Sequence, residues 1–296
     1  MYPAAFEYFS PRTVDEALEL LTQYGDEAKI LAGGQSLLPM MKLRIASPRY
    51  LIDVNRIEAL TGLRRAGDRL VMGALCRHAD VAASPLVREH LPLMLDAANL
   101  TADVQVRNRG TVAGSLAHAD PAGDWPAALM ALDTNVTIAG PHGIHTTPLD
   151  EFIVDAYTTQ LGANEMVTEV SVLMPQPPCG GAYVKFEKRA GDFAVASVGV
   201  QIALDGARCR SVAVSLGALG AMPIRARAAE ELLQGQNVSP DRLGDAERLV
   251  RGAAHPFEDT RGSVDYKRHL AGVLFRRAFA AAMDRARGSQ VSTLRI

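Results

Sequence analysis

The first periodic pattern in the chain is an amphipathic one with the period of a helix, within residues 1–55. Apolar side chains recur three and four positions apart directly after Thr13, at Val14, Ala17, Leu18 and Leu21. Thr13 and Glu16 have the spacing of a capping box. The pattern therefore predicts a helix of about 11 residues that ends near Gly25.

Two short apolar runs follow that helix, at 28–32 and 50–54, and each predicts a strand. Between them lie a pair of glycines and a segment predicted to form a short helix through Met41. Strands joined through a helix pair in parallel, so residues 1–55 should form a small α/β lobe.

The next part of the chain mixes strand and helix signals. Apolar periodicity predicts helices at about 85–100 and at 124–132. Residues 69–74 are predicted to form a strand, and alternating positions predict another at 135–139. The turn signal at 140–143 leads into a further strand.

The proline-rich stretch at 175–181 interrupts this pattern and predicts a linker. Beyond it, three strands are predicted first, at 183–186, 197–204 and 211–216. Three helices are predicted to follow: one at 225–235, one that begins with Ser239 and Pro240, and a long one at 264–285. Strands followed by helices indicate an α+β domain. We therefore expect a first domain over 1–177, made of the small lobe 1–55 and a larger α+β lobe 56–177, and a smaller C-terminal α+β domain over 178–296.

Composition narrows the class of protein. The 296 residues are 48% hydrophobic and 22% charged, with a net charge of −2, which argues against a nucleic-acid footprint. No apolar run approaches the roughly 20 residues that span a bilayer, and residues 1–7 lack the pattern of a signal peptide. We expect a cytoplasmic protein.

The chain has three isolated cysteines, Cys76, Cys179 and Cys209. We predict that they are small buried hydrophobic residues in a reducing compartment. A [2Fe–2S] cluster usually takes four thiolates, which these residues do not supply. Any such cluster should therefore sit on another chain.

Two glycine-centred segments carry the candidate chemistry, at 32–39 and 109–118. Each offers backbone N–H groups with little side chain in the way, which suits a phosphate at close range. Neither fits the common nucleotide-binding glycine motifs. Two such segments together suggest a clamp around one diphosphate, with the first of them at a helix N-terminus.

The stretches 32–44, 107–121 and 188–194 closely resemble the FAD-binding medium subunits of molybdenum hydroxylases, above all those of the carbon monoxide dehydrogenase type. The resemblance runs from Phe6 to Lys267. It implies a two-lobed FAD-binding fold of the molybdenum-hydroxylase and vanillyl-alcohol-oxidase type, unrelated to the Rossmann domain, in which the two glycine segments wrap the FAD pyrophosphate.

The resemblance also implies which residues contact FAD. We expect contacts from Leu31, Ala32, Gly33, Gly34, Gln35, Ser36, Leu37, Thr111, Gly114, Ser115, Ala117, His118, Asp124, Asp192 and Phe193. The side chains of Gln35, Ser36, Thr111 and Ser115 suit phosphate oxygens. Asp124 matches a position that reaches the ribose and the neighbouring polar edge of the flavin nucleotide, and a carboxylate there belongs away from the pyrophosphate.

Several of these residues have a competing structural interpretation. The glycines could be plain turns, and Ser36 could cap a helix, a role compatible with phosphate binding. Phe193 could lie beside the flavin or be tucked into the core of a hairpin turn. The basic side chains of Lys185, Lys188 and Arg189 fit either the vicinity of the flavin or a solvated strand edge.

The spacing of His118, Asp120 and Asp124 offers nitrogen and oxygen donors for a divalent cation, but no second cluster completes a coordination shell, so we assign no metal site. We assign no catalytic side chain either. Trp125 and the pair Met40-Met41 are read as core residues.

The resemblance implies an FAD-carrying electron-transfer subunit. Its partners would be a large subunit with the molybdenum cofactor and a small subunit with [2Fe–2S] clusters, in a dimer of heterotrimers. The final acceptor would be NAD, a quinone or oxygen. Two alternatives remain, a stand-alone flavin oxidase of the vanillyl-alcohol type and an interaction subunit without FAD. The sequence does not select among carbon monoxide, an N-heterocycle such as a purine, and an aldehyde as substrate of the complex.

Overall fold

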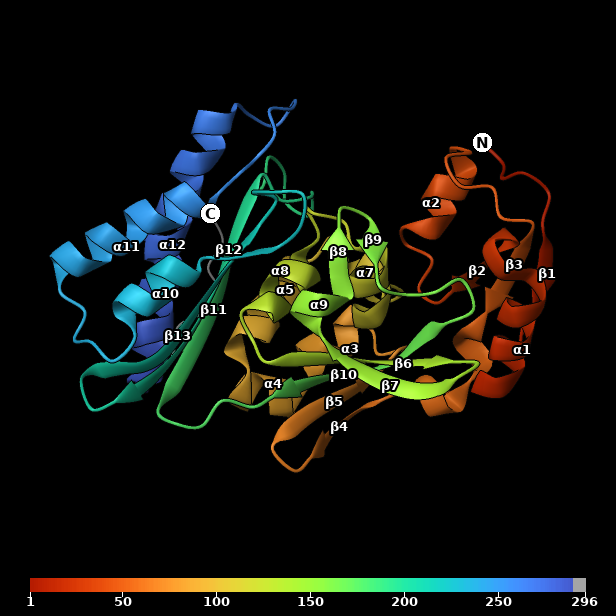
Figure 1. Cartoon of the computed structure of the whole chain (residues 1–296), viewed down its shortest axis with the longest axis horizontal. Coiled ribbons are helices and arrows are strands. Elements are labelled where there is room, and N and C mark those ends of the chain that lie inside the picture. The colour runs from red at the N-terminus through yellow and green to blue at the C-terminus, as the bar shows by residue number, and fades with distance from the viewer. Residues whose placement is uncertain (290–296) are drawn as a thin grey trace.

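Three bodies follow one another along the long axis of the molecule (Figure 1). The structure is a computed structural model that describes residues 1–289. A small N-terminal lobe lies at one end, a larger lobe in the middle and the C-terminal domain at the other end (Figure 1). The mixture of helix and sheet agrees with the predicted α+β class.

The small lobe is a parallel three-stranded sheet with one covering helix. The strands are β1 (Glu7–Phe9), β2 (Ala28–Leu31) and β3 (Tyr50–Asp53), in the order β1-β3-β2. The parallel pairing of β2 with β3 confirms the prediction, whereas β1 was not predicted. The helices are α1 (Val14–Tyr24), which packs on β2 and β3, and the short α2 (Leu37–Lys42).

Helix α1 has the predicted length and start. Its 11 residues begin after Thr13, whose hydroxyl accepts a hydrogen bond from the Glu16 amide at 3.1 Å. The Glu16 carboxylate reaches back to the amide of Arg12, one residue before the cap, at 2.7 Å. Both ends of the capping interaction are thus satisfied locally.

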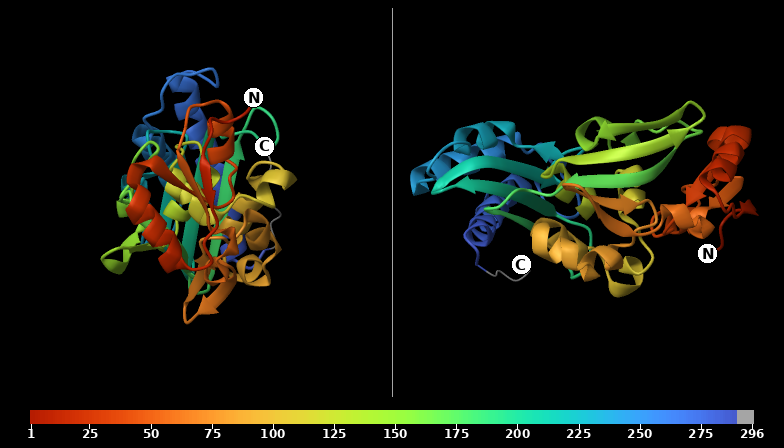
Figure 2. Two further views of the ribbon diagram at one scale, coloured as in Figure 1. Left: turned by 90° about the vertical axis from the view of Figure 1, so that its right-hand side faces the viewer. Right: turned by 90° about the horizontal axis from the view of Figure 1, so that it is seen from below.

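The larger lobe is built on an antiparallel sheet with helices on one side (Figure 2, right). In sheet order its strands are β4 (Leu63–Ala66), β5 (Arg69–Gly73), β10 (Met166–Leu173), β6 (Thr134–Gly140) and β7 (Gly143–Pro148). Between β5 and β6 come α3 (His78–Ala83), α4 (Pro85–His90), α5 (Pro92–Leu100), α6 (Val104–Arg107), α7 (Val112–His118) and α8 (Asp124–Met130). A short α9 (Leu149–Phe152) and the pair β8 (Ile153–Asp155) and β9 (Thr158–Thr159) follow β7.

The single helix predicted over 85–100 is wrong, because the structure divides it into α4 and α5. Leu91, between them, has φ −136° and ψ 59°, outside the helical region. Pro92 restricts the residue before it and is itself accepted at the first position of a new helix. The apolar periodicity continues across the break, which is why it concealed this break.

The C-terminal domain is an antiparallel sheet with helices, as expected. Its strands are β11 (Cys179–Phe186), β12 (Ala196–Asp205), β13 (Arg208–Gly217) and β14 (Ile224–Arg225). Its helices are α10 (Arg227–Leu233), α11 (Pro240–Ala253) and α12 (Val264–Ala286). No helix within residues 1–289 combines the length and the apolar character that crossing a membrane requires.

The two faces of β11 serve different neighbours. Ala182 and Val184 belong to the core under α12, whereas Tyr183 belongs to the core of the larger lobe. Gly180 faces α12 so closely that a Cβ there would lie 2.2 Å from the Ala282 carbonyl oxygen. Because side chains alternate along a strand, Lys185 lies on the same face as Tyr183 and is directed toward the larger lobe.

Candidate functional site

The two glycine segments meet in space. A Cβ added to Gly33 would lie 2.4 Å from the carbonyl oxygen of Arg109 and 2.7 Å from the Cα of Gly110. Residue 33 is therefore glycine because the backbone of the second segment occupies the place of a side chain. Residue 34 is glycine for a different reason, because its backbone has a φ of +72°, which other residues rarely adopt.

The first segment presents a run of unpaired backbone donors. Within the described chain, no hydrogen bond engages the amide N–H groups of 33–37, whereas Leu38 N–H donates to the Gly34 carbonyl at 3.1 Å. Ser36 stands at the position before α2 but makes no capping hydrogen bond. Its hydroxyl and these amides are the donor set that phosphate oxygens take.

The second segment is hydrogen-bonded to the backbone of the larger lobe, and its Thr111 caps helix α7. Val112 N–H donates to the Cys76 carbonyl and His78 N–H to the Gly110 carbonyl, each at 3.1 Å. The Thr111 hydroxyl caps α7 by accepting from Gly114 N–H at 3.1 Å. A Cβ on Gly114 would lie 2.6 Å from that hydroxyl oxygen, so Gly114 is glycine because of the cap. These contacts leave the amides of Thr111 and Ala113 without a partner in the described chain.

Two polar side chains that the sequence did not single out, Asn55 and Arg77, contact the backbone of the two segments. Asn55 lies in the 3₁₀ turn directly after β3, and Arg77 directly before α3. The sequence does carry a signal for Asn55, because it lies just past the carboxyl end of the strand predicted at 50–54. That strand was predicted to pair in parallel with the strand at 28–32, which leads into the first segment. Arg77 carries no local signal.

His78 lies behind the second segment as a buried, neutral imidazole. Only 3% of its surface is exposed, and its ring stacks on Trp125 with 5.7 Å between centroids. Burial, with a further contribution from Arg107, lowers its pKa to about 4. A Cβ on Gly110 would lie 2.6 Å from its Nε2, so the imidazole sets how close the backbone of the second segment comes to the lobe.

A buried polar network surrounds Asp124, the first residue of α8. Its carboxylate accepts hydrogen bonds from the Tyr183 hydroxyl at 2.9 Å and from Lys185 Nζ at 3.1 Å. Lys185 Nζ also donates to the Leu100 carbonyl at 2.9 Å and lies 3.0 Å from Glu187 Oε2. Burial raises the pKa of Asp124, and the Lys185 ammonium opposes that rise. The solvated edge considered for Lys185 is wrong, because its side chain is fully buried.

His118, the last residue of the second segment, and Asp120 lie beside the exposed side chain of Tyr157. The rings of His118 and Tyr157 are 5.3 Å apart, and burial followed by Asp120 raises the pKa of Tyr157. Asp120 and Tyr157 line a cavity of about 160 Å³ that reaches Ala194 in the C-terminal domain. Within residues 1–289 no group of three or more His, Cys, Asp or Glu side chains is arranged to hold a metal ion.

Phe193 lies at the surface. Its side chain is 48% exposed, and the guanidinium of Arg261 lies 5.8 Å from the ring centroid. The interpretation that Phe193 is tucked into a core is therefore wrong. The neighbouring Lys188 donates to the Thr260 carbonyl, so the loop between β11 and β12 is tied to the segment before α12.

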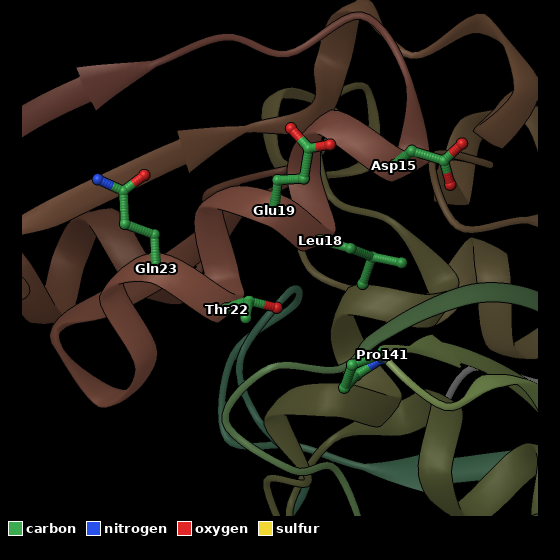
Figure 3. A pocket seen from close by; sticks show the side chains of 6 residues that line it. All are labelled: Asp15, Leu18, Glu19, Thr22, Gln23 and Pro141. Atoms are coloured by element: carbon green, nitrogen blue, oxygen red, sulfur yellow. The ribbon is translucent and has the colours of Figure 1, made fainter.

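A cavity that no glycine segment lines lies between α1 and the turn after β6 (Figure 3). It has a volume of about 450 Å³ and is lined by Asp15, Leu18, Glu19, Thr22, Gln23 and Pro141. It contains two carboxylates and no basic side chain, and none of its residues belongs to a glycine segment. This cavity is therefore unsuited to a diphosphate.

Comparison with known proteins gives a consistent result over nearly the whole chain. Residues 4–176 match the family described as the FAD binding domain in molybdopterin dehydrogenase. Residues 181–282 match the CO dehydrogenase flavoprotein C-terminal domain.

Individual relatives match along almost their full length. The carbon monoxide dehydrogenase medium chain of Hydrogenophaga pseudoflava is 40% identical over 285 residues, which cover 96% of this chain and 99% of the relative. The nicotine 6-hydroxylase medium subunit of Paenarthrobacter nicotinovorans is 37% identical over 278 residues, 94% of this chain and 97% of the relative. A solved structure of carbon monoxide dehydrogenase from Hydrogenophaga pseudoflava superposes with a TM-score of 0.94 at 42% identity, covering 96% of this chain and 99% of the other.

Proposed function

Because the chain belongs to the FAD-binding medium subunits of the molybdenum hydroxylase family, we propose that it carries electrons between two partners. It receives them from [2Fe–2S] clusters on a partner subunit and passes them to an external acceptor. FAD suits this position because a flavin exchanges single electrons with a cluster and two electrons with an acceptor.

The observation that carries the proposal is the meeting of two segments that both present free backbone donors. The first offers the amides of 33–37 and the Ser36 hydroxyl, and the second offers the amides of Thr111 and Ala113. The close contact at Gly33 brings the two donor sets together. This donor set fits the diphosphate of FAD, which several N–H groups can hold without a basic side chain.

The remaining site residues divide by their chemistry. We propose that Leu31, Ala32, Gly34, Gln35, Leu37, Gly114, Ser115 and Ala117 line the nucleotide, and that His118, Asp124, Asp192 and Phe193 contact its sugar and flavin portions. To these the structure adds Lys185 as a candidate, since it is bonded to Asp124. In the buried network, Lys185 fixes the Asp124 carboxylate and supplies a positive charge that disfavours protonation of that carboxyl. No side chain acts as nucleophile or general base.

The rest of the assembly follows from the same proposal. Partner subunits carry the molybdenum cofactor and the iron–sulfur clusters, and the substrate pocket lies on the large subunit. We propose a dimer of heterotrimers and NAD, a quinone or oxygen as acceptor. Within this chain, we propose that residues 1–177 form the FAD-binding domain and residues 178–296 the C-terminal domain of the flavoprotein, of which 290–296 lie outside the described residues.

The test begins with the purified full-length chain, alone and with its co-expressed partners. We expect one FAD per chain, released into the supernatant by acid precipitation because neither glycine segment offers a cysteine for covalent linkage. Flavin that stays with the precipitate, or release of FMN, would contradict the proposed clamp.

The second half of the test addresses the role of the subunit. The FAD-loaded chain alone should contain no iron or molybdenum and should leave carbon monoxide, N-heterocycles and aldehydes unoxidised. Once chemically reduced, it should still pass electrons to an acceptor. Oxidation of a substrate by the metal-free chain would favour a stand-alone flavin oxidase instead.

A further inference from the structure

The two glycine segments come from different lobes, so something must fix their separation. The first follows β2 of the small lobe, and the second precedes α7 of the larger lobe. Where they meet, the Arg109 carbonyl oxygen occupies the space that a side chain on residue 33 would need. A shift of either lobe by a few tenths of an ångström would open or crowd this contact.

Asn55 holds the first segment from the small-lobe side. Its Nδ2 donates to the Ala32 carbonyl at 2.8 Å. The amide is itself oriented by Asp53, whose Oδ1 accepts from Asn55 Nδ2 at 2.6 Å and from Asn55 N–H at 2.9 Å. The C=O of Ala32 and the N–H of Gly33 share one planar trans peptide and point in opposite directions. The bond to Asn55 therefore turns the Gly33 N–H away from Asn55 and leaves it free.

Arg77 holds the second segment and reaches back to Asn55. Its Nη1 donates to the Arg109 carbonyl at 2.6 Å, and its Nη2 donates to Asn55 Oδ1 at 3.2 Å. The carbonyl that Arg77 holds is the one that lies against Gly33. Within residues 1–289, Arg77 forms no salt bridge, and its guanidinium donates hydrogen bonds to the Arg109 carbonyl and to Asn55 Oδ1.

We propose that Asn55 and Arg77 are positioning residues that join the two glycine segments at a fixed separation, so that both present their amides to one diphosphate. The chain of contacts runs from the Ala32 carbonyl through Asn55 and Arg77 to the Arg109 carbonyl. This inference rests on the proposed binding of FAD.

The residue types match this task. A primary amide has a donor and an acceptor on one rigid plane, which lets Asn55 donate to a carbonyl while it accepts from a guanidinium. The guanidinium has a planar fork with separate donors, whereas an ammonium is a point charge at the end of a flexible stem. Lysine at position 77 would keep the charge and could reach one of the two oxygens, but it would not bridge both.

The first measurement is the FAD dissociation constant of the full-length chain, purified with its partners if they are needed for loading. We expect Arg77→Ala to weaken FAD binding by about tenfold to a hundredfold and Asn55→Ala by about threefold to tenfold, the range for loss of a charged and a neutral hydrogen bond. Arg77→Lys should lose most of what Arg77→Ala loses. Because the two residues form one bridge, the double variant Asn55→Ala/Arg77→Ala should lose less than the product of the single effects.

The second measurement reports on the segments without FAD. Amide hydrogen exchange of His78 and Val112, which bond around the second segment, and of Leu38 in the first, should accelerate in the Asn55 and Arg77 variants. Arg69→Ala is the matched control. Arg69 also donates to backbone and side-chain oxygens, those of Asp133 and Ser171, but neither of these residues belongs to a glycine segment. Its loss should leave the three amides and the FAD affinity unchanged.

The outcomes separate this inference from the proposed function. A wild-type complex that binds no FAD refutes the proposed function, while the exchange measurement still tests the bridge. Wild-type affinity in Arg77→Lys would show that only the charge matters and would overturn the inference. Independent, multiplicative effects of the two single variants, or acceleration in Arg69→Ala of the same size, would overturn it as well. If Arg77→Ala fails to fold, Arg77→Lys and Asn55→Ala decide the question.

Discussion

At the scale of single residues, the glycines of the site are required for different reasons. Gly33 must lack a side chain because the Arg109 carbonyl occupies its place, Gly34 because its φ is +72°, and Gly114 because it lies against the Thr111 cap. Of these three glycines, Gly33 is the one whose missing side chain makes room for the other segment. A substitution there should therefore act on cofactor binding more than on the stability of either lobe.

Gly33→Val tests this reason. A Cβ only 2.4 Å from a carbonyl oxygen forces the two segments apart, so we expect flavin content per chain to fall to a small fraction of the wild-type value. The antiparallel sheet of the C-terminal domain should stay folded, as judged by circular dichroism. Gly252→Ala in α11, where a Cβ meets open space, is the control and should retain full flavin content.

His78 gives a prediction for pH. The unfolded residue takes up a proton near its ordinary pKa of 6.5, whereas burial lowers the pKa of the folded residue to about 4. The unfolded state therefore binds more protons between these values, so stability falls as pH falls from about 7 to about 4 and levels off below that. The gap corresponds to roughly 3 kcal/mol at about 1.4 kcal/mol per pKa unit.

The measurement is the free energy of unfolding by urea at several pH values in this range. His78→Phe keeps an aromatic ring beside Trp125 and cannot be protonated, so its stability should depend less steeply on pH than that of the wild type. His142→Phe, at an exposed turn position, is the control. Equal pH slopes in wild type and His78→Phe would contradict the assignment of the neutral, buried imidazole.

At the scale of elements, two short helices follow the glycine segments but begin differently. Helix α7 is capped by the Thr111 hydroxyl, whereas α2 starts after Ser36 without a side-chain cap. The first arrangement uses the hydroxyl for structure, and the second leaves it free for a ligand. The local sequences, each with a hydroxyl residue before an apolar turn, do not distinguish the two cases.

Thr111 provides the prediction at this scale. Loss of an N-cap costs about 1 kcal/mol, so Thr111→Ala should lower the free energy of unfolding of the larger lobe by about that amount and weaken FAD binding. Thr111→Ser keeps the capping oxygen and should restore most of both. If serine restores stability but not FAD affinity, the methyl group of Thr111 rather than the cap governs the site. Denaturant unfolding and flavin titration measure the two effects.

At the scale of the whole molecule, a buried ion pair fastens the C-terminal domain to the larger lobe. Arg285 of α12 donates to Asp96 of α5 at 2.6 Å and 3.1 Å, and the Asp96 side chain is 1% exposed. Asp96 also accepts from the amide of Tyr183 in β11. These contacts hold the two domains that together enclose the Asp124 network.

Removal of one partner leaves a buried charge, so Arg285→Ala should destabilise the chain by about 3–5 kcal/mol. Arg276→Ala removes an exposed pair with Glu247 and should cost no more than about 1 kcal/mol. Both changes are measured by denaturant unfolding. Equal small losses in the two variants would show that the domains do not depend on the buried pair.

Local sequence patterns were enough to predict the features that depend on neighbours along the chain. The capping and periodicity of α1, the parallel pair β2 and β3, the strands β12 and β13 and the long α12 all follow from local patterns. The motifs at 32–44, 107–121 and 188–194 indicated the family. Local patterns succeed here because side chains a few positions apart on one helix or strand already meet.

The contacts between residues that are distant in sequence became visible only in the folded chain. The contact of Gly33 with Arg109, the bridge from Asn55 to Arg77 and the burial of Lys185 against Asp124 join residues 22 to 76 positions apart. A polar side chain looks the same in sequence whether it is solvated or buried. Its environment is set by the packing of the lobes, and so the reason why each residue of the site has its identity becomes visible only when the lobes are together.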